Sequence, residues 1–435
     1  MMEITNIALI IAAVATLISI LPENADKSKN VIGGSVICGG ILIFINKEDS
    51  KIITSELIKW DVIILIIFLT IFVDILDDLG YFDYIGIYLV KLTRGNLKYL
   101  FVSFGVMMYL MSAFLDNVTA IILLSSLTIT VCKRINISPK PFLIYEVFIT
   151  GVGALLTPVG SVPNIILNSG AHISFIDWML YLGPFSIVAF IVSTIYFYLL
   201  FRKQLNVNLP DAKKEEIDYL DPNQVIRSRK DIFLSSSLIL LLVLSFIIAE
   251  FLHVGIEVMA VGVSVITMFL TKTKSSHVYA KIDWNTLFFF TGLFIVVGSL
   301  SLSGALLPLS SVMADLLQTN PSLLLLFILI LGGLISTGFN NIPISLIITS
   351  ILVSISSQQV VGDSIWYASS IATNIGASMT PIGSIVVIIA FEALKKSNYE
   401  IKLGDYFKKV FPLFIIISIL GWLYLTLLIS LKILP

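Results

Sequence analysis

One carboxylate lies in the middle of a long apolar stretch. Asp116 occurs in the run SAFLDNVTAIILLSSL, where an acid at membrane depth costs about 2.5 to 3.5 kcal/mol on insertion scales. Such acids are usually retained for an ion, a proton or a polar partner. The alternative is a helix cap that accepts hydrogen bonds from free N–H groups. Asn117 follows it, and its carboxamide can tie down a turn or coordinate a cation through its oxygen. Asp116 is therefore our first candidate for ion or proton chemistry.

A helix-breaking pentapeptide occurs twice. It reads Thr-Pro-Val-Gly-Ser at 157–161 and Thr-Pro-Ile-Gly-Ser at 380–384. Proline removes a donor and glycine permits non-helical dihedrals, so we expect a helix to unwind at each copy. Unwinding frees carbonyls on one half-helix and N–H groups on the other, which suit a cation and an oxyanion or hydroxyl ligand respectively. A simple proline kink is the alternative at each place.

The pentapeptides belong to a duplication of the whole chain. GALLTPVGSV from Gly153 and GASMTPIGSI from Gly376 share six of ten residues. Further pairs recur at an offset of 224: Trp60/Trp284, Gly80/Gly304, Asn96/Asn320, Ser112/Ser336 and Asn117/Asn341. At this offset the repeat mate of Asp116 is the neutral Asn340. In a membrane protein, a repeat with interrupted helices points to a transporter built from two halves.

The two breaks are not identical. Pro163 and Asn164 follow the first break, whereas Val386 and Val387 stand at the equivalent places after the second. We therefore expect the first break to extend further, so that the two half-sites are unequal.

The chain is a membrane protein by composition. It is 57% hydrophobic and 13% charged, with a mean hydropathy of +1.01. Apolar runs long enough to cross roughly 30 Å of hydrocarbon lie at about 4–21, 31–46, 60–79, 141–168, 176–201, 232–249, 256–271, 284–303, 364–391 and 408–431. The first run has no basic n-region or small-residue cleavage site, so we expect a retained helix and not a signal peptide.

Two further segments are too long for one crossing. Residues 97–133 and 323–357 are apolar but broken near their middles by AFLDNVTA and GFNNIPIS. We interpret them as re-entrant hairpins with polar tips inside the membrane, which requires that the tips be buried in protein or line a wet cavity. The predicted fold is an all-α polytopic membrane protein made of two inverted five-span units, each with one hairpin and one broken helix.

Charge supports this topology. Five crossings per half put 23 of the 27 Lys and Arg residues on one side, in segments 22–30, 80–98, 133–140, 202–231, 272–283 and 392–409. Because cytoplasmic loops retain basic residues, that side is inside and both termini are outside. The first hairpin then opens toward the cytoplasm and the second toward the exterior. The predicted organisation is a first repeat at 1–202 with its broken helix at 141–168, a cytoplasmic linker at 203–231, and a second repeat at 232–435 with its broken helix at 364–391.

We expect the tips and breaks of both halves to meet around one polar cavity at the bilayer midplane. The predicted substrate and ion site consists of Asp116, Asn117, Thr119, Thr157, Pro158, Gly160, Ser161, Asn164, Asn340, Asn341, Asn374, Thr380, Pro381, Gly383 and Ser384.

Other polar residues are weaker candidates. Glu146 lies in the span that leads to the first break, and together with Asp116 it is our candidate for a proton relay. Asp74, Asp77 and Asp78 end the third span, where we expect them in the cytoplasmic interface. The two cysteines, Cys38 and Cys132, are expected to be buried thiols. We expect no metal site and no cofactor, and no nucleophile–base pair indicates an enzyme.

At these residues the chain resembles the ion transporter superfamily, in particular its branch of arsenite/antimonite permeases and sodium/proton antiporters, which is citrate-transporter-like. DNVTA with the following TPVGSVPN is similar to the first-half signature of that branch. NNIPIS, NIGASMTPIGS and YEIKLGDYFKK are most similar to the second half of arsenite permeases. The resemblance implies an inverted-repeat fold, a homodimer, elevator-like movement and, for an arsenite pump, a soluble ATPase partner.

The hairpin tips bear on the substrate. Carboxylate symporters of the superfamily carry Ser-Asn-Thr at both tips, whereas this chain has Asp-Asn-Val at 116–118 and Asn-Asn-Ile at 340–342. A buried acid beside a dicarboxylate adds like-charge repulsion, but it suits a cation, a proton or neutral trihydroxy-arsenic. We rank proton-coupled efflux of arsenite or antimonite first. Sodium/proton antiport and transport of inorganic, di- or tricarboxylate anions follow, and a non-transport membrane scaffold or enzyme comes last.

These considerations give the remaining expectations. The protein should lie in the plasma membrane, with the lipid bilayer and a small inorganic or organic ion as its partners and with no nucleic acid. The coupling ion should be H⁺ or Na⁺.

Overall fold

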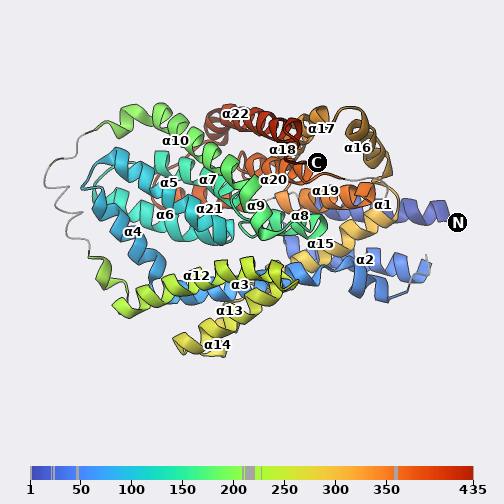
Figure 1. Cartoon of the computed structure of the whole chain (residues 1–435), viewed down its shortest axis with the longest axis horizontal. Coiled ribbons are helices and arrows are strands. Elements are labelled where there is room, and N and C mark those ends of the chain that lie inside the picture. The colour runs from blue at the N-terminus through green and yellow to red at the C-terminus, as the bar shows by residue number, and fades with distance from the viewer. Residues whose placement is uncertain are drawn as a thin grey trace.

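The computed structural model describes residues 2–20, 22, 25–45, 49–207, 210, 221–226, 228–356 and 361–434 (Figure 1). Every regular element within these residues is a helix. The first half contains α1 (Met2–Ser19), α2 (Lys27–Gly40), η1 (Ile41–Ile45), η2 (Ile52–Leu57), α3 (Trp60–Asp78), α4 (Tyr81–Leu92), α5 (Leu97–Phe114), α6 (Asn117–Arg134), α7 (Lys140–Ala154), α8 (Val162–Ala171), α9 (Phe175–Tyr181) and α10 (Gly183–Leu205). The second contains α12 (Arg229–Phe251), α13 (Ile256–Thr271), α14 (Ser275–Lys281), α15 (Trp284–Leu302), α16 (Leu307–Thr319), α17 (Pro321–Phe327), η4 (Ile328–Gly332), α18 (Gly333–Gly338), α19 (Asn341–Ser356), α20 (Asp363–Ala377), α21 (Ile385–Lys396) and α22 (Leu403–Ser430), after the short turn η3 (Pro222–Gln224).

The predicted interruptions lie where the sequence indicates them. The segment at 97–133 is two helices, α5 and α6, that are separated only by Leu115 and Asp116. The segment at 323–357 is α17, η4 and α18, followed by α19 after a gap at Phe339 and Asn340. Both pentapeptides lie in non-helical chain, between α7 and α8 and between α20 and α21. The all-α membrane fold predicted from composition is confirmed.

The repeat pairs have matching structural roles. Gly80 and Gly304 directly follow the C-caps of α3 and α15, and both adopt left-handed φ angles, of 75° and 78°. Glycine is the residue that takes this conformation without steric cost. Asn96 and Asn320 each cap the following helix, α5 or α17, by accepting hydrogen bonds from N–H groups of its first turn. These roles explain why the pairs recur at one offset.

Packing between the halves is reciprocal. The packing pairs are α2 on α15 and α13 on α3, so in each half the helix that begins at the repeated tryptophan, Trp60 or Trp284, contacts the second helix of the other half. The helix after each break packs on the second hairpin arm of the other half, as α8 on α19 and α21 on α6. This exchange is the arrangement expected of two similar units that face one another. Their opposite orientation in the membrane stays a prediction.

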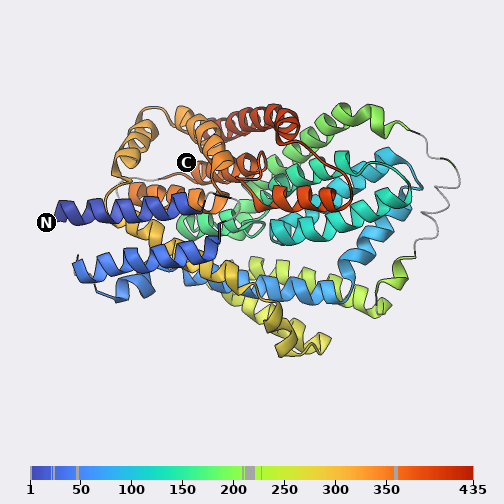
Figure 2. The same ribbon diagram turned by 180° about the vertical axis from the view of Figure 1, so that it is seen from behind.

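The interrupted elements occupy the middle of the molecule. In Figures 1 and 2, α5 to α8 and α18 to α21 form a central band, with α10 and α22 along one side and α3, α12 and α13 along the other. The core is continuous, since one cluster of buried apolar side chains includes residues of both halves. The hairpin tips and helix breaks are therefore enclosed by helices.

Eight helices within the described residues are long and apolar enough to cross a membrane. They include the hairpin arms α5 and α6, each of 18 residues, which at 1.5 Å per residue is about 27 Å. Length alone therefore does not distinguish a re-entrant arm from a crossing one. The distribution of Lys and Arg between the two sides of the membrane does not distinguish them either. A pair of arms returns the chain to the side from which it started, whether the arms cross the bilayer fully or turn back inside it.

Two expected loops contain helices. Segment 80–98 holds α4, and the chain between α15 and the second hairpin holds α16. Helix α4 buries Tyr81, Phe82, Gly86 and Val90 along one side. Only one side of such a helix is apolar, so it gives no continuous apolar run in the sequence. Much of the predicted linker, including Lys213 to Glu216, lies outside the described residues.

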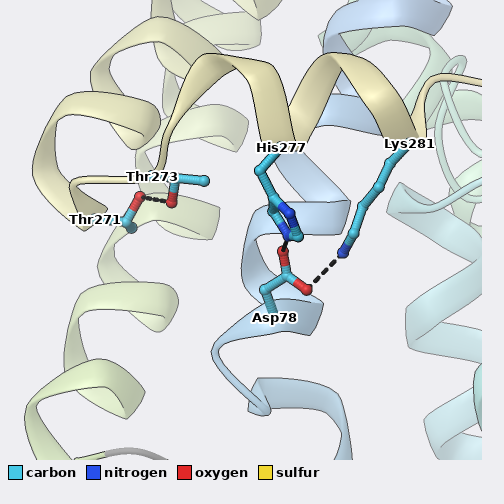
Figure 3. A network of polar contacts seen from close by, with 5 residues as sticks. All are labelled: Asp78, Thr271, Thr273, His277 and Lys281. Carbon is cyan, nitrogen blue, oxygen red and sulfur yellow. Dashed lines mark hydrogen bonds and ion pairs between the residues drawn. The ribbon is translucent and has the colours of Figure 1, made fainter.

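Cys38 and Cys132 are buried free thiols, as predicted. Asp78, at the end of α3, holds α14 by two contacts that Figure 3 shows. Its Oδ1 lies 2.5 Å from Lys281 Nζ, and its Oδ2 lies 3.1 Å from His277 Nε2. Because these side chains are partly exposed, the contacts contribute little to stability. They do place the end of α3 beside segment 272–283, which the charge analysis assigns to the same side of the membrane.

Candidate transport site

The two hairpin tips are capped in the same way. Asp116 Oδ2 accepts a hydrogen bond of 3.0 Å from the Val118 N–H at the start of α6. Asn340 Oδ1 accepts one of 3.0 Å from the Ile342 N–H at the start of α19. A neutral amide therefore occupies the equivalent capping position of the second hairpin and makes the corresponding contact.

A serine on the first arm fastens each tip to the broken helix. Ser112 Oγ lies 2.6 Å from the Thr150 carbonyl oxygen and 2.5 Å from Asn117 Oδ1. Its repeat mate, Ser336, donates to the Thr373 carbonyl at 3.0 Å. Both serines are fully buried. The sequence marked this pair as repeated, but its role becomes visible only in the packed structure.

The threonine of each pentapeptide makes a second attachment. Thr157 Oγ1 donates to the Ala113 carbonyl, and Thr380 Oγ1 donates to the Thr337 carbonyl at 2.5 Å. Each acceptor is a carbonyl near the C-terminus of a hairpin's first arm, where helical carbonyls lack partners. The unwound segment and the hairpin tip of one half therefore hold each other in place. Pro158 and Pro381 lie within the two unwound segments.

Each pentapeptide requires a glycine at its fourth position. A Cβ at Gly160 would lie 2.6 Å from the Ala154 oxygen and 2.9 Å from the Ser112 oxygen. A Cβ at Gly383 would lie 2.6 Å from the Ser336 oxygen. These are backbone atoms, which cannot move aside cheaply. The close approach of break and hairpin thus accounts for the glycine in both copies.

The serine of each pentapeptide starts the second half-helix. Ser161 Oγ accepts from the Asn164 N–H at 3.4 Å, and Ser384 Oγ accepts from the Val386 N–H at 3.3 Å. Helices α8 and α21 therefore begin at the two breaks, with their N-termini facing the unwound segments. Helix N-termini of this kind favour negative or electron-rich ligand atoms.

The expected extension of the first break is wrong. Pro163 lies in the first turn of α8, where proline is tolerated because its missing N–H would have no helical partner. Asn164 is helical as well. The unwound segments run from 155 to 161 and from 378 to 384. The inequality of the two halves lies instead in the contacts of the Asn164 side chain.

Asn164 links the two halves through a buried network. Its Nδ2 donates to the carbonyls of Ala154 at 2.7 Å and Thr157 at 3.2 Å, in the first break. Its Oδ1 accepts from Ser370 Oγ at 2.7 Å and Asn374 Nδ2 at 2.8 Å, both on α20 of the second half. Ser370 was not predicted, because nothing in its local sequence indicates a partner 206 residues away.

The tips line different cavities in this conformation. Asp116 and Thr119 line a small cavity of about 30 Å³ with side chains of α3 and α8, which is enough for about one water. Asn340 and Ile382 line a separate, mainly apolar cavity of about 340 Å³ beside α1 and α16. The single polar cavity expected from the sequence is therefore not present among the described residues, although the Asn164 network connects the two half-sites.

Asn341 and Glu146 are the last predicted residues to be placed. Asn341 lies at the second tip, and its backbone N–H donates to the Gly383 carbonyl at 3.2 Å, which joins this tip to the second break. Glu146 is fully buried on α7, between α7 and α6. It belongs to the helix that leads into the first break and not to the break itself.

Paired interrupted helices, with polar hairpin tips against each interruption, define the class of the protein as a membrane transporter. The chain belongs to the CitMHS citrate transporter family, whose sequence profile matches residues 2–372 and 300–435.

Related proteins agree with this assignment. A 46 kDa membrane protein of Mycobacterium leprae is 29% identical over 415 residues, covering 95% of this chain and 96% of that protein. The arsenical pump membrane protein of Escherichia coli is 24% identical over 390 residues, covering 87% and 89%. The crystal structure of the YdaH transporter of Alcanivorax borkumensis superposes with a TM-score of 0.58 at 13% identity, covering 98% of both chains. That last likeness concerns the fold alone.

Proposed function

We propose that the protein is a secondary active transporter of the cell membrane that exports arsenite or antimonite in exchange for protons. The observation that carries the proposal is the surroundings of Asp116. Its carboxylate is the one charged group among the residues that line the first-half cavity, and the other lining side chains are apolar or are the hydroxyls of Thr70 and Thr119. The chemistry of this lining suits a small neutral polyhydroxy species or a cation, and the cavity of about 30 Å³ must widen to admit anything larger than about one water.

A carboxylate substrate fits less well. A di- or tricarboxylate beside Asp116 would meet like-charge repulsion, and no basic side chain lines either tip cavity except Lys27, at the second. The N-termini of α8 and α21 are the elements that would favour an anion. Citrate, the substrate in the family's name, is therefore the competitor against which arsenite must be tested. The similarity to an arsenical pump membrane protein supports arsenite.

Sodium/proton antiport is the second candidate. It is favoured by the position of Asn117 Oδ1 directly after Asp116, since carboxylate and amide oxygens are ligands for hard cations. In both cases one group serves cargo and proton alternately. Protonation of Asp116 would disfavour a cation or remove an acceptor for trihydroxy-arsenic, and bound cargo would hinder protonation. This exclusion is how a proton gradient could drive export.

The fold consists of a central band of hairpins and broken helices and of helices outside it. We propose that the central band moves as one body against the outer helices. We also propose that two chains form a dimer and that no enzymatic step occurs in this chain. We retain an ATPase as a partner only for the arsenite case. We also propose that both termini lie outside and that the chain between α10 and α12 is cytoplasmic, from the distribution of Lys and Arg.

Transport into everted membrane vesicles tests the substrate. Vesicles with and without the protein receive labelled arsenite, sodium or citrate, each with and without an imposed pH gradient. We expect gradient-dependent accumulation of arsenite. Accumulation of citrate without arsenite would contradict the proposed cargo, and accumulation of sodium would select the second candidate.

A further inference from the structure

Glu146 is a buried carboxyl with one oxygen unpaired. It lies on α7 and has no exposed surface. Its Oε1 accepts a hydrogen bond of 2.6 Å from Thr128 Oγ1 on α6. Its Oε2 is buried and has no hydrogen-bond partner. Buried polar atoms are nearly always paired, so an unpaired carboxyl oxygen inside a membrane protein indicates a function.

Among the described residues, no basic side chain acts on this carboxyl. The ionisable side chains near enough to interact with it are Cys132 on α6 and Tyr145 on α7, and the Tyr145 hydroxyl is hydrogen-bonded to Thr194 at 2.7 Å. Thiol and phenol are uncharged at neutral pH. An ionised Glu146 would thus be an isolated buried charge, which is strongly disfavoured.

The repeat has no second acid at this place. In the broken helices the repeat offset is 223, as the pairs Thr157/Thr380 and Thr150/Thr373 show, so the mate of Glu146 is Ser369. Ser369 Oγ donates to the Ile365 carbonyl of its own helix at 2.8 Å. On α21, which packs on both α6 and α7, the residue that corresponds to Asn164 is Val387, which is apolar and buried. The buried carboxyl is therefore specific to the first repeat.

Glu146 is separate from Asp116. Its partner Thr128 is 12 residues along α6 from Asp116, about 18 Å at the helical rise. It is only six residues from Arg134, at the end of α6 that the charge analysis assigns to the cytoplasm. The buried residues between them on α6 are Ala120, Ile121, Leu124 and Ser125, so the stretch between the two acids on this helix is mainly apolar.

We propose that Glu146 is a second proton-binding site, which holds its proton in this conformation and exchanges it with cytoplasmic water by local opening of the packing among α6, α7 and α21, an event separate from the movement of these elements as one body. The proton leaves Oε2 for water and returns from water, and no other bond changes. The inference rests on the proposed proton coupling for its role in transport. The bound proton itself requires no cargo.

Infrared difference spectroscopy tests the bound proton directly. The purified protein in lipid, without substrate, is titrated with pH, and protein labelled with ¹³C-glutamate assigns the bands. We expect a C=O stretching band of a protonated glutamic acid that E146Q lacks and D116N retains. Substitution T128V should shift this band to higher frequency, because the acid loses its hydrogen bond, whereas a purely structural carboxylate would show no such band.

The outcomes separate this proposal from the transport function. If the ¹³C-sensitive acid band is absent from the wild-type protein at neutral pH, where exposed glutamates are ionised, Glu146 is ionised and the proposal is overturned, whether or not E146Q folds. Arsenite export could then still be driven through Asp116. If the band is present but arsenite is not transported, the proton site stands and the proposed cargo fails.

Discussion

The Asn164 network should be one of the largest single contributions to stability in the central band. Its side chain makes two hydrogen bonds to the first break, at Ala154 and Thr157, and two to α20, at Ser370 and Asn374. In N164A, Asn374 Nδ2 keeps its bond to the Ser370 carbonyl at 2.9 Å, and the Thr157 carbonyl keeps its bond from the Gly160 N–H at 3.4 Å. The Ala154 carbonyl and the Ser370 hydroxyl lose the partner that Asn164 provided. At about 1–3 kcal/mol for each buried unpaired group, the loss is at least about 2 kcal/mol.

Thermal unfolding in detergent, followed by the fraction of monodisperse protein, measures this effect. Because 1 kcal/mol corresponds to about 2–4 °C in domains of 150–250 residues and to less in a larger chain, we expect a midpoint a few degrees below wild type. The matched control is S169A on the same helix α8. Ser169 Oγ donates to the Ile166 carbonyl at 2.8 Å within its own helix and is only half-buried, so its loss should cost less than about 1 kcal/mol. Equal midpoints for N164A and S169A would refute the network's role.

Gly376→Ala should severely destabilise the protein, because the added Cβ would lie 2.2 Å from a backbone oxygen of α18. Gly338→Ala is the control and should be tolerated, because its Cβ meets nothing within 4 Å. Comparable thermal unfolding of the two variants would contradict the packing. Cysteine introduced at Lys432 should react with an impermeant maleimide in intact cells, whereas cysteine at Lys133 or Lys396 should react only after permeabilisation; labelling of position 133 in intact cells would overturn the topology.

Local sequence signals located the interruptions well. Proline, glycine and polar residues inside apolar runs have direct backbone consequences, so the tips at Asp116 and Asn340 and both pentapeptides were found without the structure. The repeat marked Ser112 and Ser336 as a matched pair, but their hydrogen bonds to the broken helices are visible only in the structure. The amphipathic helix α4 was missed because only one side of it is apolar.

The contacts between halves could not be found in this way. The partners Asn164 and Ser370 are 206 residues apart, and their meeting depends on how α8 crosses α20. The same holds for the cavities, whose walls come from α1, α3 and α16 as well as from the tips. Pro163 shows the limit of residue-type reasoning, since proline both breaks helices and occupies their first turn.

The coupling function of Asp116 is the central claim, and gradient-driven arsenite transport by D116N in proteoliposomes tests it most directly. The amide of Asn340 caps the second hairpin at the same 3.0 Å distance as Asp116 caps the first, so D116N should fold and assemble like wild type. The matched control is D177N, since Asp177 lies on α9 and is bonded to Ser174 at 2.9 Å, outside the site. We predict that D116N loses the response to a pH gradient and that D177N keeps it. Undiminished gradient-driven transport by D116N would show that Asp116 is only a helix cap.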